Sequence, residues 1–154
     1  MATQSARAPR APRLTPLYLG GCVSLAGSGS DADSCRGGDH YDRTRERMTR
    51  ELATRFRTPR ERLLGVFEVQ GLSFTEPGFR GCAFVSANAE SSPGSSVEEV
   101  TEDYRTWVRS LFLDLAKEAG AADPEHLAQQ LVLLYDGAGI SAWMDHDASI
   151  AQAA

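Results

Sequence analysis

Apolar residues recur at three- and four-residue spacing along most of the chain after residue 38, and this pattern predicts helices. The strongest case begins at Val97, continues through Leu115 and ends before Gly120. No segment shows the sustained alternation of apolar and polar residues that is typical of a half-buried strand. We therefore expect an all-α fold, an antiparallel helical bundle that follows a disordered N-terminal segment.

Capping signals mark the start of three of the expected helices. Each has a side chain that can accept a hydrogen bond from the first turn, followed by a proline or a glutamate: Thr58 with Pro59 and Glu61, Ser96 with Glu99, and Asp123 with Pro124. These signals predict helices that start near residues 58, 96 and 123. The last of them should continue to about Met144.

Two further helices are expected from their composition. The first should begin at an Asp39 cap and end near Arg57, with many arginines outside its apolar face; a shorter one should cover about Phe79 to Ala89. Inside the last helix, Gly137 and Gly139 lower helix stability, so we expect them to allow close contact with another helix.

The N-terminal part of the chain differs from the rest in composition and charge. Residues 1–38 combine an Ala-Pro-Arg repeat with a run rich in Gly, Ser and Asp, which buries too little apolar surface to offset its ordering entropy. Residues 1–58 hold ten arginines and six acids, whereas residues 59–154 hold six basic and fifteen acidic residues. A basic front suits an approach to nucleic acid, although many basic tails have no such role.

Three ranges follow from these patterns. Residues 1–38 form the segment expected to be disordered, residues 39–147 form one helical domain, and residues 148–154 form a short C-terminal tail. The three cysteines, Cys22, Cys35 and Cys82, are odd in number and widely spaced, which argues against a disulfide framework.

The cysteine pattern indicates a reducing compartment, and we expect a cytoplasmic protein. No run approaches the ~20 apolar residues of a membrane span, so no membrane partner is expected. An alternative interpretation is a signal peptide, because three arginines precede the apolar residues 14–26. Proline, glycine and polar residues interrupt that stretch and favour the cytoplasmic interpretation.

Four segments resemble, in their order, the regulatory domain of the TetR family of transcriptional regulators: Pro-Arg-Glu-Arg-Leu-Leu at 59–64, Glu-Pro-Gly-Phe-Arg-Gly-Cys at 76–82, the helix with Trp107, and Leu-Leu-Tyr-Asp-Gly-Ala at 133–138. The resemblance covers about Asp39 to Asp147. Its most specific part is residues 79–90, because many family members share a nearly identical Gly-Cys-x-Phe-x-x-Ala sequence there.

The resemblance implies a division of roles. In that family a helix-turn-helix domain binds operator DNA, a helix equivalent to residues 39–57 links it to the regulatory domain, and that domain binds ligand and forms dimers through its last two long helices. A homodimer is therefore expected, with four interface candidates: Leu131, Leu134, Ala138 and Ala142.

Two departures from the family pattern change the expected function. The helix-turn-helix is not recognisable in residues 1–38, and the last family helix normally continues past the position of Ala154. We therefore expect a truncated regulator that does not bind operator DNA specifically by itself. The alternative hypothesis is a free-standing helical interaction module that heterodimerises with a full-length regulator.

Aromatic residues at helical spacing suit an apolar pocket for a small hydrophobic effector, and they suit a filled core equally well. Gln70 and Asn88 are polar residues at or beside apolar faces and are candidates for orienting a ligand. The pocket candidates are Phe67, Gln70, Phe74, Phe84, Asn88, Tyr104 and Trp107.

Patterns for catalysis or metal binding are weak. Cys82 has no His nearby in sequence that could act as its general base, so we expect it to pack in the core. The sequences Asp145-His146-Asp147 and Asp39-His40 lack the ligand spacing of strong metal motifs. The acidic residues Glu98, Glu99, Glu102 and Asp103 have the normal placement for the start of a helix. We expect no enzymatic activity, no cofactor and no metal.

Overall fold

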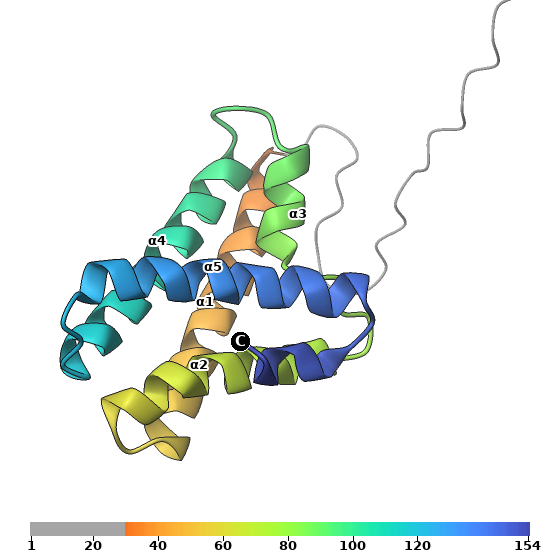
Figure 1. Ribbon diagram of the computed structural model, residues 1–154. Coiled ribbons are helices and arrows are strands. Elements are labelled where there is room, and N and C mark those ends of the chain that lie inside the picture. The colour runs from red at the N-terminus through yellow and green to blue at the C-terminus, as the bar shows by residue number, and fades with distance from the viewer. Residues whose placement is uncertain (1–29) are drawn as a thin grey trace, which may run out of the picture.

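The computed structural model describes residues 30–154, and the expectations for residues 1–29, including Cys22, lie outside this part of the chain. Within it the chain forms five α-helices, a final 3-10 helix and no strand (Figure 1). The elements are α1 (Ser30–Arg55), α2 (Pro59–Phe74), α3 (Ala83–Glu90), α4 (Ser96–Glu118), α5 (Pro124–Met144) and η1 (Ala148–Gln152). The predicted all-α fold is confirmed.

Two of the predicted capping sites are confirmed in detail. The Thr58 hydroxyl accepts a hydrogen bond from the Glu61 backbone N–H at 3.2 Å, and the Glu61 carboxylate accepts one from the Thr58 N–H at 3.0 Å. At the start of α5, the Asp123 carboxylate accepts a hydrogen bond from the His126 N–H at 3.0 Å. Both helices have a proline at the start, where a missing N–H is tolerated.

The cap of α4 lies one residue earlier than predicted. Ser95 is the capping residue, and its hydroxyl accepts from the Glu98 N–H at 3.3 Å. Glu98 in turn accepts from the backbone N–H of Gly94 rather than from that of the cap. Two adjacent serines each have a glutamate three residues later, so the local pattern fits both registers and the packing of the helix selects one.

The start of α3 is also corrected, from Phe79 to Ala83. Gly78 and Gly81 both have φ of +84°, in the left-handed region that a right-handed helix excludes. The chain therefore makes turns through residues 75–82 and becomes helical only after Gly81.

Helix α1 begins at Ser30, nine residues before the predicted Asp39 cap, so that start was wrong and residues 30–38 are helical. Extending a helix that already exists adds one hydrogen bond for each residue ordered, which is much easier than nucleating one. Packing of the C-terminal half of α1 thus supports an N-terminal extension that its Gly and Ser content does not favour.

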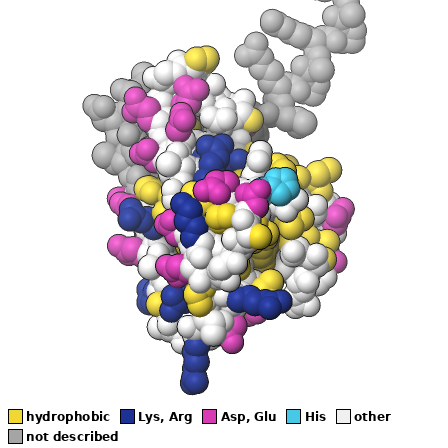
Figure 2. Space-filling model, turned by 60° about the vertical axis from the view of Figure 1, so that its left-hand side comes forward, with side chains coloured by type: hydrophobic (Ala, Val, Ile, Leu, Met, Phe, Trp, Pro, Cys, Tyr) yellow, Lys and Arg dark blue, Asp and Glu magenta, His cyan; other side chains and the backbone are white. Residues whose placement is uncertain are grey.

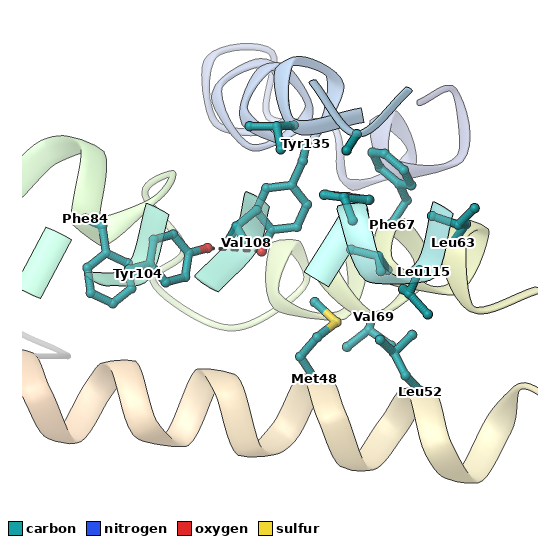
Figure 3. Close-up of a cluster of buried hydrophobic side chains, with 14 residues drawn as sticks. Met48, Leu52, Leu63, Phe67, Val69, Phe84, Tyr104, Val108, Leu115 and Tyr135 are labelled. Atoms are coloured by element: carbon teal, nitrogen blue, oxygen red, sulfur yellow. Dashed lines mark hydrogen bonds between the residues drawn. The ribbon is translucent and has the colours of Figure 1, made fainter. Parts of the chain in front are cut away.

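The main core lies where α1, α2, α4 and α5 meet (Figures 1 and 3). Val66 and Phe112 have no exposed surface. In Figure 3, Met48 and Leu52 of α1 point upward into the same cluster as Val69 and Leu115. Leu64 of α2 is apolar but 63% exposed. The helix instead buries Val66 and Val69, which lie on the side of α2 that faces the other helices.

A second, smaller cluster joins η1 to the body of the domain. Phe74 of α2, Ala138 and Ala142 of α5, and Ala151 of η1 are buried together. A Cβ atom on Gly71 would lie 2.7 Å from the Cβ atom of Ala151, so the missing side chain lets η1 approach α2. The residues expected as a tail thus pack onto the domain, a contact that the helical pattern gave no sign of.

The glycines of α5 are explained only in part by close contact. A Cβ atom on Gly139 would lie 3.5 Å from Nε2 of Gln70 on α2, which agrees with the expected contact between helices. A Cβ atom on Gly137 would have no neighbour within 4 Å. The predicted close contact with another helix is therefore wrong at Gly137 within a single chain.

Candidate ligand cavity

A cavity of about 350 Å³ lies between α1, α2, the turns at residues 75–82, α3, and the facing sides of α4 and α5. This volume is at the lower end of the roughly 300 to 1,000 Å³ that small-molecule sites occupy. The cavity is the candidate functional site.

Two aromatic pairs form much of the cavity wall. The rings of Phe74 and Phe79 lie 5.0 Å apart between centroids, and those of Phe84 and Tyr104 stack at 4.0 Å with 15° between their planes. Figure 3 shows the second pair side by side, with the Tyr104 hydroxyl directed at Tyr135. Stacked rings with few rotatable bonds provide a rigid apolar surface.

One face of α1 closes the cavity on another side. His40, Thr44, Arg47 and Met48 line it at intervals of four, three and one residues, which places them on adjacent turns of the helix. The sequence interpretation treated this helix as a linker and missed them. The helical spacing of His40, Thr44 and Met48 was the signal that could have indicated an inward face.

Gln70 is the polar residue best placed to orient a ligand. Its Nε2 donates to the backbone oxygen of Tyr135 at 2.8 Å. Because a carbonyl oxygen only accepts, the amide nitrogen must face Tyr135 and Oε1 must face the other way. Oε1 is buried, and among the described residues no group donates a hydrogen bond to it.

Two ion pairs lie at the cavity, whose lining also includes Arg80 and Glu90. Arg47 of α1 forms an ion pair with Glu76 of the turn after α2, and Arg105 of α4 forms one with Asp136 of α5. The second pair is more shielded, with both side chains less than one third exposed. Neither pair requires a charged ligand for balance.

Two titratable side chains in the wall favour their neutral forms. Burial of part of the His40 ring, together with the nearby Arg43, lowers the pKa of His40. Burial raises the pKa of the Cys82 thiol. A raised thiol pKa disfavours the reactive thiolate, which agrees with the packing role expected for Cys82.

The structure brings together four of the seven pocket candidates, because Gln70, Phe74, Phe84 and Tyr104 all line the cavity. The other three, Phe67, Asn88 and Trp107, do not line it.

Their positions explain the difference. Phe67 packs against Phe112 and Tyr135 in the filled core, and Trp107 packs against Tyr41 and Tyr104. Asn88 is exposed on α3. Helical spacing shows that a residue faces inward, but only packing decides whether it meets another side chain or a cavity.

The four dimer-interface candidates do not lie on one exposed face. Ala138 and Ala142 are buried inside this chain by Phe74 and Ala151, and Leu131 packs partly against the main core. Leu134 is 46% exposed. The outward apolar residues of α5 are instead Leu133, Leu134, Ile140, Trp143 and Met144.

The face of the molecule shown in Figure 2 has no large patch of a single charge. In Figure 2, basic and acidic side chains are interspersed on the face shown, and hydrophobic ones gather toward one edge. Among residues 30–154 no group of three His, Cys, Asp or Glu side chains could hold a metal ion. No helix in this range is long and apolar enough to cross a membrane.

The described residues thus form an all-helical domain with a cavity against its first helix. Comparison with solved structures gives a more specific result. The chain is similar to the crystal structure of a protein from Streptomyces avermitilis described as a "putative TetR-transcriptional regulator".

The two proteins share 27% sequence identity, with a TM-score of 0.67 over 81% of this chain and 68% of the other. No protein-family model matches the sequence, and no match is found among curated proteins. The chain has the fold of a TetR-family C-terminal domain, and the resemblance predicted from its motifs is confirmed.

Proposed function

We propose that this TetR-like regulator domain senses a small apolar effector in the cavity between α1 and α2 to α5. The observation that carries the proposal is the position of α1, whose residues His40, Thr44 and Met48 form one wall of the cavity. A ligand that contacts these residues contacts the helix that, by resemblance, leads to the DNA-binding half of a complete regulator.

The contacts of α1 indicate how occupancy is transmitted. Its far end is held in the core through Met48 and Leu52, whereas its near end contacts the cavity through the His40 ring, 5.4 Å from the Phe84 ring. The ion pair of Arg47 with Glu76 lies between them. A ligand can therefore move the N-terminal half of α1 while the C-terminal half stays fixed. Its binding then shifts the equilibrium between two positions of this helix.

The test is a thermal-shift screen of apolar and aromatic compounds, with titration calorimetry on each compound that stabilises the protein. A ligand present at about 100 times its Kd should stabilise the folded state by about 2.7 kcal/mol. Thr44→Phe fills the cavity from α1 and should abolish binding, whereas Thr49→Phe on the exposed side of the same helix should leave it intact. Equal binding by both variants, or no stabilising compound, argues against this site.

The exposed apolar face of α5 supports the second part of the proposal, a homodimer. Leu133, Gly137, Ile140 and Met144 recur at helical spacing, and three of them are large and 40% or more exposed. Gly137 in the middle of this stripe lets a second helix approach closely. TetR-like regulators are typically dimers, and α5 presents a surface suited to pairing with its copy.

The alternative is that the same face pairs with a different, full-length regulator. The exposed residues of α5 are the same in both cases, so the choice depends on which of the two complexes is stronger. Light scattering of the chain alone, then with such a regulator, separates the two. A stable homodimer that does not exchange with the other chain supports the first proposal.

The third part of the proposal concerns DNA. We propose that this chain alone does not recognise an operator sequence. Reading bases requires a rigid helix in the major groove with flanking basic groups on phosphates. Residues 1–38 are basic at their start but rich in Pro, Gly and Ser. Sequence-selective binding in a gel-shift assay that persists at high salt would overturn this proposal.

A further inference from the structure

The chemistry of the cavity also defines the class of effector, an inference that rests on the proposed sensing function. We propose that the effector is a neutral aromatic molecule with one O–H or N–H donor, which it directs at Oε1 of Gln70. Three separate observations support this description. The aromatic rings of the wall support an aromatic ligand, the acceptor without a protein donor supports a ligand donor, and the paired charges support a neutral ligand.

The acceptor is the most specific part. Oε1 of Gln70 is buried and no group of residues 30–154 donates to it, although buried polar atoms normally have a partner. The amide cannot turn over to present its nitrogen instead, because Nε2 donates to the backbone oxygen of Tyr135 at 2.8 Å. Gln70 lines the cavity, and in this proposal its unpartnered oxygen accepts the hydrogen bond of the bound molecule.

Ligand donors are favoured over ligand acceptors by the other polar groups of the wall. The hydroxyls of Tyr104 and Tyr135 lie 3.1 Å apart and bond to each other. The Ser73 hydroxyl donates to the backbone oxygen of Gln70 on its own helix. The Thr44 hydroxyl donates to the backbone oxygen of His40 at 2.9 Å. The Ser73 and Thr44 protons therefore have acceptors within the protein, and one of the two tyrosine protons is used within the pair.

The neutral character of the ligand follows from the charge pairs. Arg47 is held by Glu76 and Asp136 is held by Arg105, so a carboxylate or ammonium placed against either pair would have to compete with an existing partner. His40, whose pKa is lowered, is neutral at pH 7 and attracts neither. An ion entering this partly apolar cavity would also lose hydration without a new counter-charge.

The aromatic character follows from the rings that line the cavity. Phe74 and Phe79 present tilted rings 5.0 Å apart, and Phe84 lies against Tyr104 in a stack. A planar ligand ring can extend either arrangement, since offset and edge-to-face contacts add to the energy of burial. A volume of about 350 Å³ limits it to one or two rings with short substituents.

Matched probes that differ only in the donor test the proposal. The pairs are 2-naphthol with 2-methoxynaphthalene and 4-propylphenol with 4-propylanisole, and 2-naphthoate serves as the anionic probe. Titration calorimetry on the wild-type chain should show each phenol binding about tenfold more tightly than its ether, the upper range for one net hydrogen bond. 2-Naphthoate should bind more weakly than 2-naphthol.

The variant Gln70→Leu keeps the approximate size of the side chain and removes the acceptor. It should lose the preference for phenol over ether while still binding the ether, and its circular dichroism spectrum should match the wild type. The control Gln129→Leu removes an exposed amide from α5 and should keep the preference.

The outcomes separate this inference from the function on which it rests. Equal binding of phenol and ether to the wild-type chain, a preference that survives Gln70→Leu, or tighter binding of 2-naphthoate overturns the donor proposal but leaves an apolar sensor in place. Absence of binding by all five probes contradicts both the ligand class and the sensing function for aromatic effectors.

Discussion

The hydroxyl groups of Tyr104 and Tyr135 lie 3.1 Å apart in the interior, where they join α4 to α5. Both side chains are almost fully buried, and burial raises the pKa of each well above the usual value for tyrosine. Both therefore remain neutral hydroxyls at physiological pH. The pair is a buried polar contact between two helices that the more exposed Arg105–Asp136 ion pair also joins.

Removing one hydroxyl should cost more than removing both. Tyr104→Phe or Tyr135→Phe leaves the other hydroxyl buried without its partner, which should destabilise the fold by about 1 to 3 kcal/mol. The double variant should lose less than the sum of the single variants, because two apolar rings then face each other. Urea denaturation of the four proteins measures the coupling, and strictly additive losses would show that the contact contributes nothing.

The close approach of η1 to α2 predicts an unusual effect of alanine inside a helix. Gly71→Ala should destabilise the domain by about 1 to 3 kcal/mol, because the new Cβ atom overlaps that of Ala151, although alanine is the better helix former. Adding Ala151→Gly should recover most of that loss. The free energy of unfolding, measured with urea, tests both.

Gly137→Ala is the matched control, since nothing lies within 4 Å of its Cβ position. Measured at low protein concentration, it should keep or raise stability by up to about 1 kcal/mol. Stabilisation by Gly71→Ala of the same size would contradict the packing of η1 on α2.

The capping box predicts a pH dependence. Hydrogen bonds from the backbone N–H groups of Thr58 and Arg57 lower the pKa of Glu61. As pH falls, the unfolded chain takes up the proton first, so this stabilisation is present above the unfolded pKa and is lost as pH falls through the folded one. Glu61→Gln keeps an oxygen acceptor but does not titrate. Between about pH 6 and about pH 3, the wild-type protein should therefore lose more stability than the variant.

Denaturation in urea at a series of pH values compares the two proteins. Parallel curves for the wild type and Glu61→Gln would show that the hydrogen bonds to the carboxylate do not favour its ionised form in solution.

The exposed apolar face of α5 predicts that a single charged substitution on it will dissociate the proposed dimer. Leu133 is 67% exposed and Leu64 of α2 is 63% exposed, so the two residues are matched in the chain alone. Leu133→Glu should convert a dimer to a monomer, because it places a charge at a contact between two copies of α5. Leu64→Glu should leave the dimer intact. Light scattering measures both masses, and an equal response of the two variants would place the interface elsewhere.

Local chemistry predicted several features correctly. The caps at Thr58 and Asp123 involve residues at most three positions apart, so the sequence contains everything they need. The cap of α4 was misplaced by one residue because both Ser95 and Ser96 are followed three positions later by a glutamate. The segment at residues 76–82 was recognised by its motif, but its left-handed glycines delay α3 to Ala83.

The candidate site was only partly predictable. Periodicity identified Phe67, Phe84 and Tyr104 equally well as inward-facing aromatic residues. It could not show that Phe67 meets Phe112 in a filled core while Phe84 borders a cavity, because that depends on which helix lies opposite. For the same reason the α1 wall at Thr44 was missed.

The sequence by itself determined the class of fold, the confirmed helix caps and the resemblance to TetR-type regulators, because helical periodicity, capping and motifs are local properties of the chain. Tertiary structure alone decided that Ala138 and Ala142 are buried under η1, that Leu133 faces outward, and that Gln70 presents a buried acceptor. Each of these depends on contacts between residues distant in sequence, which form only when the helices pack.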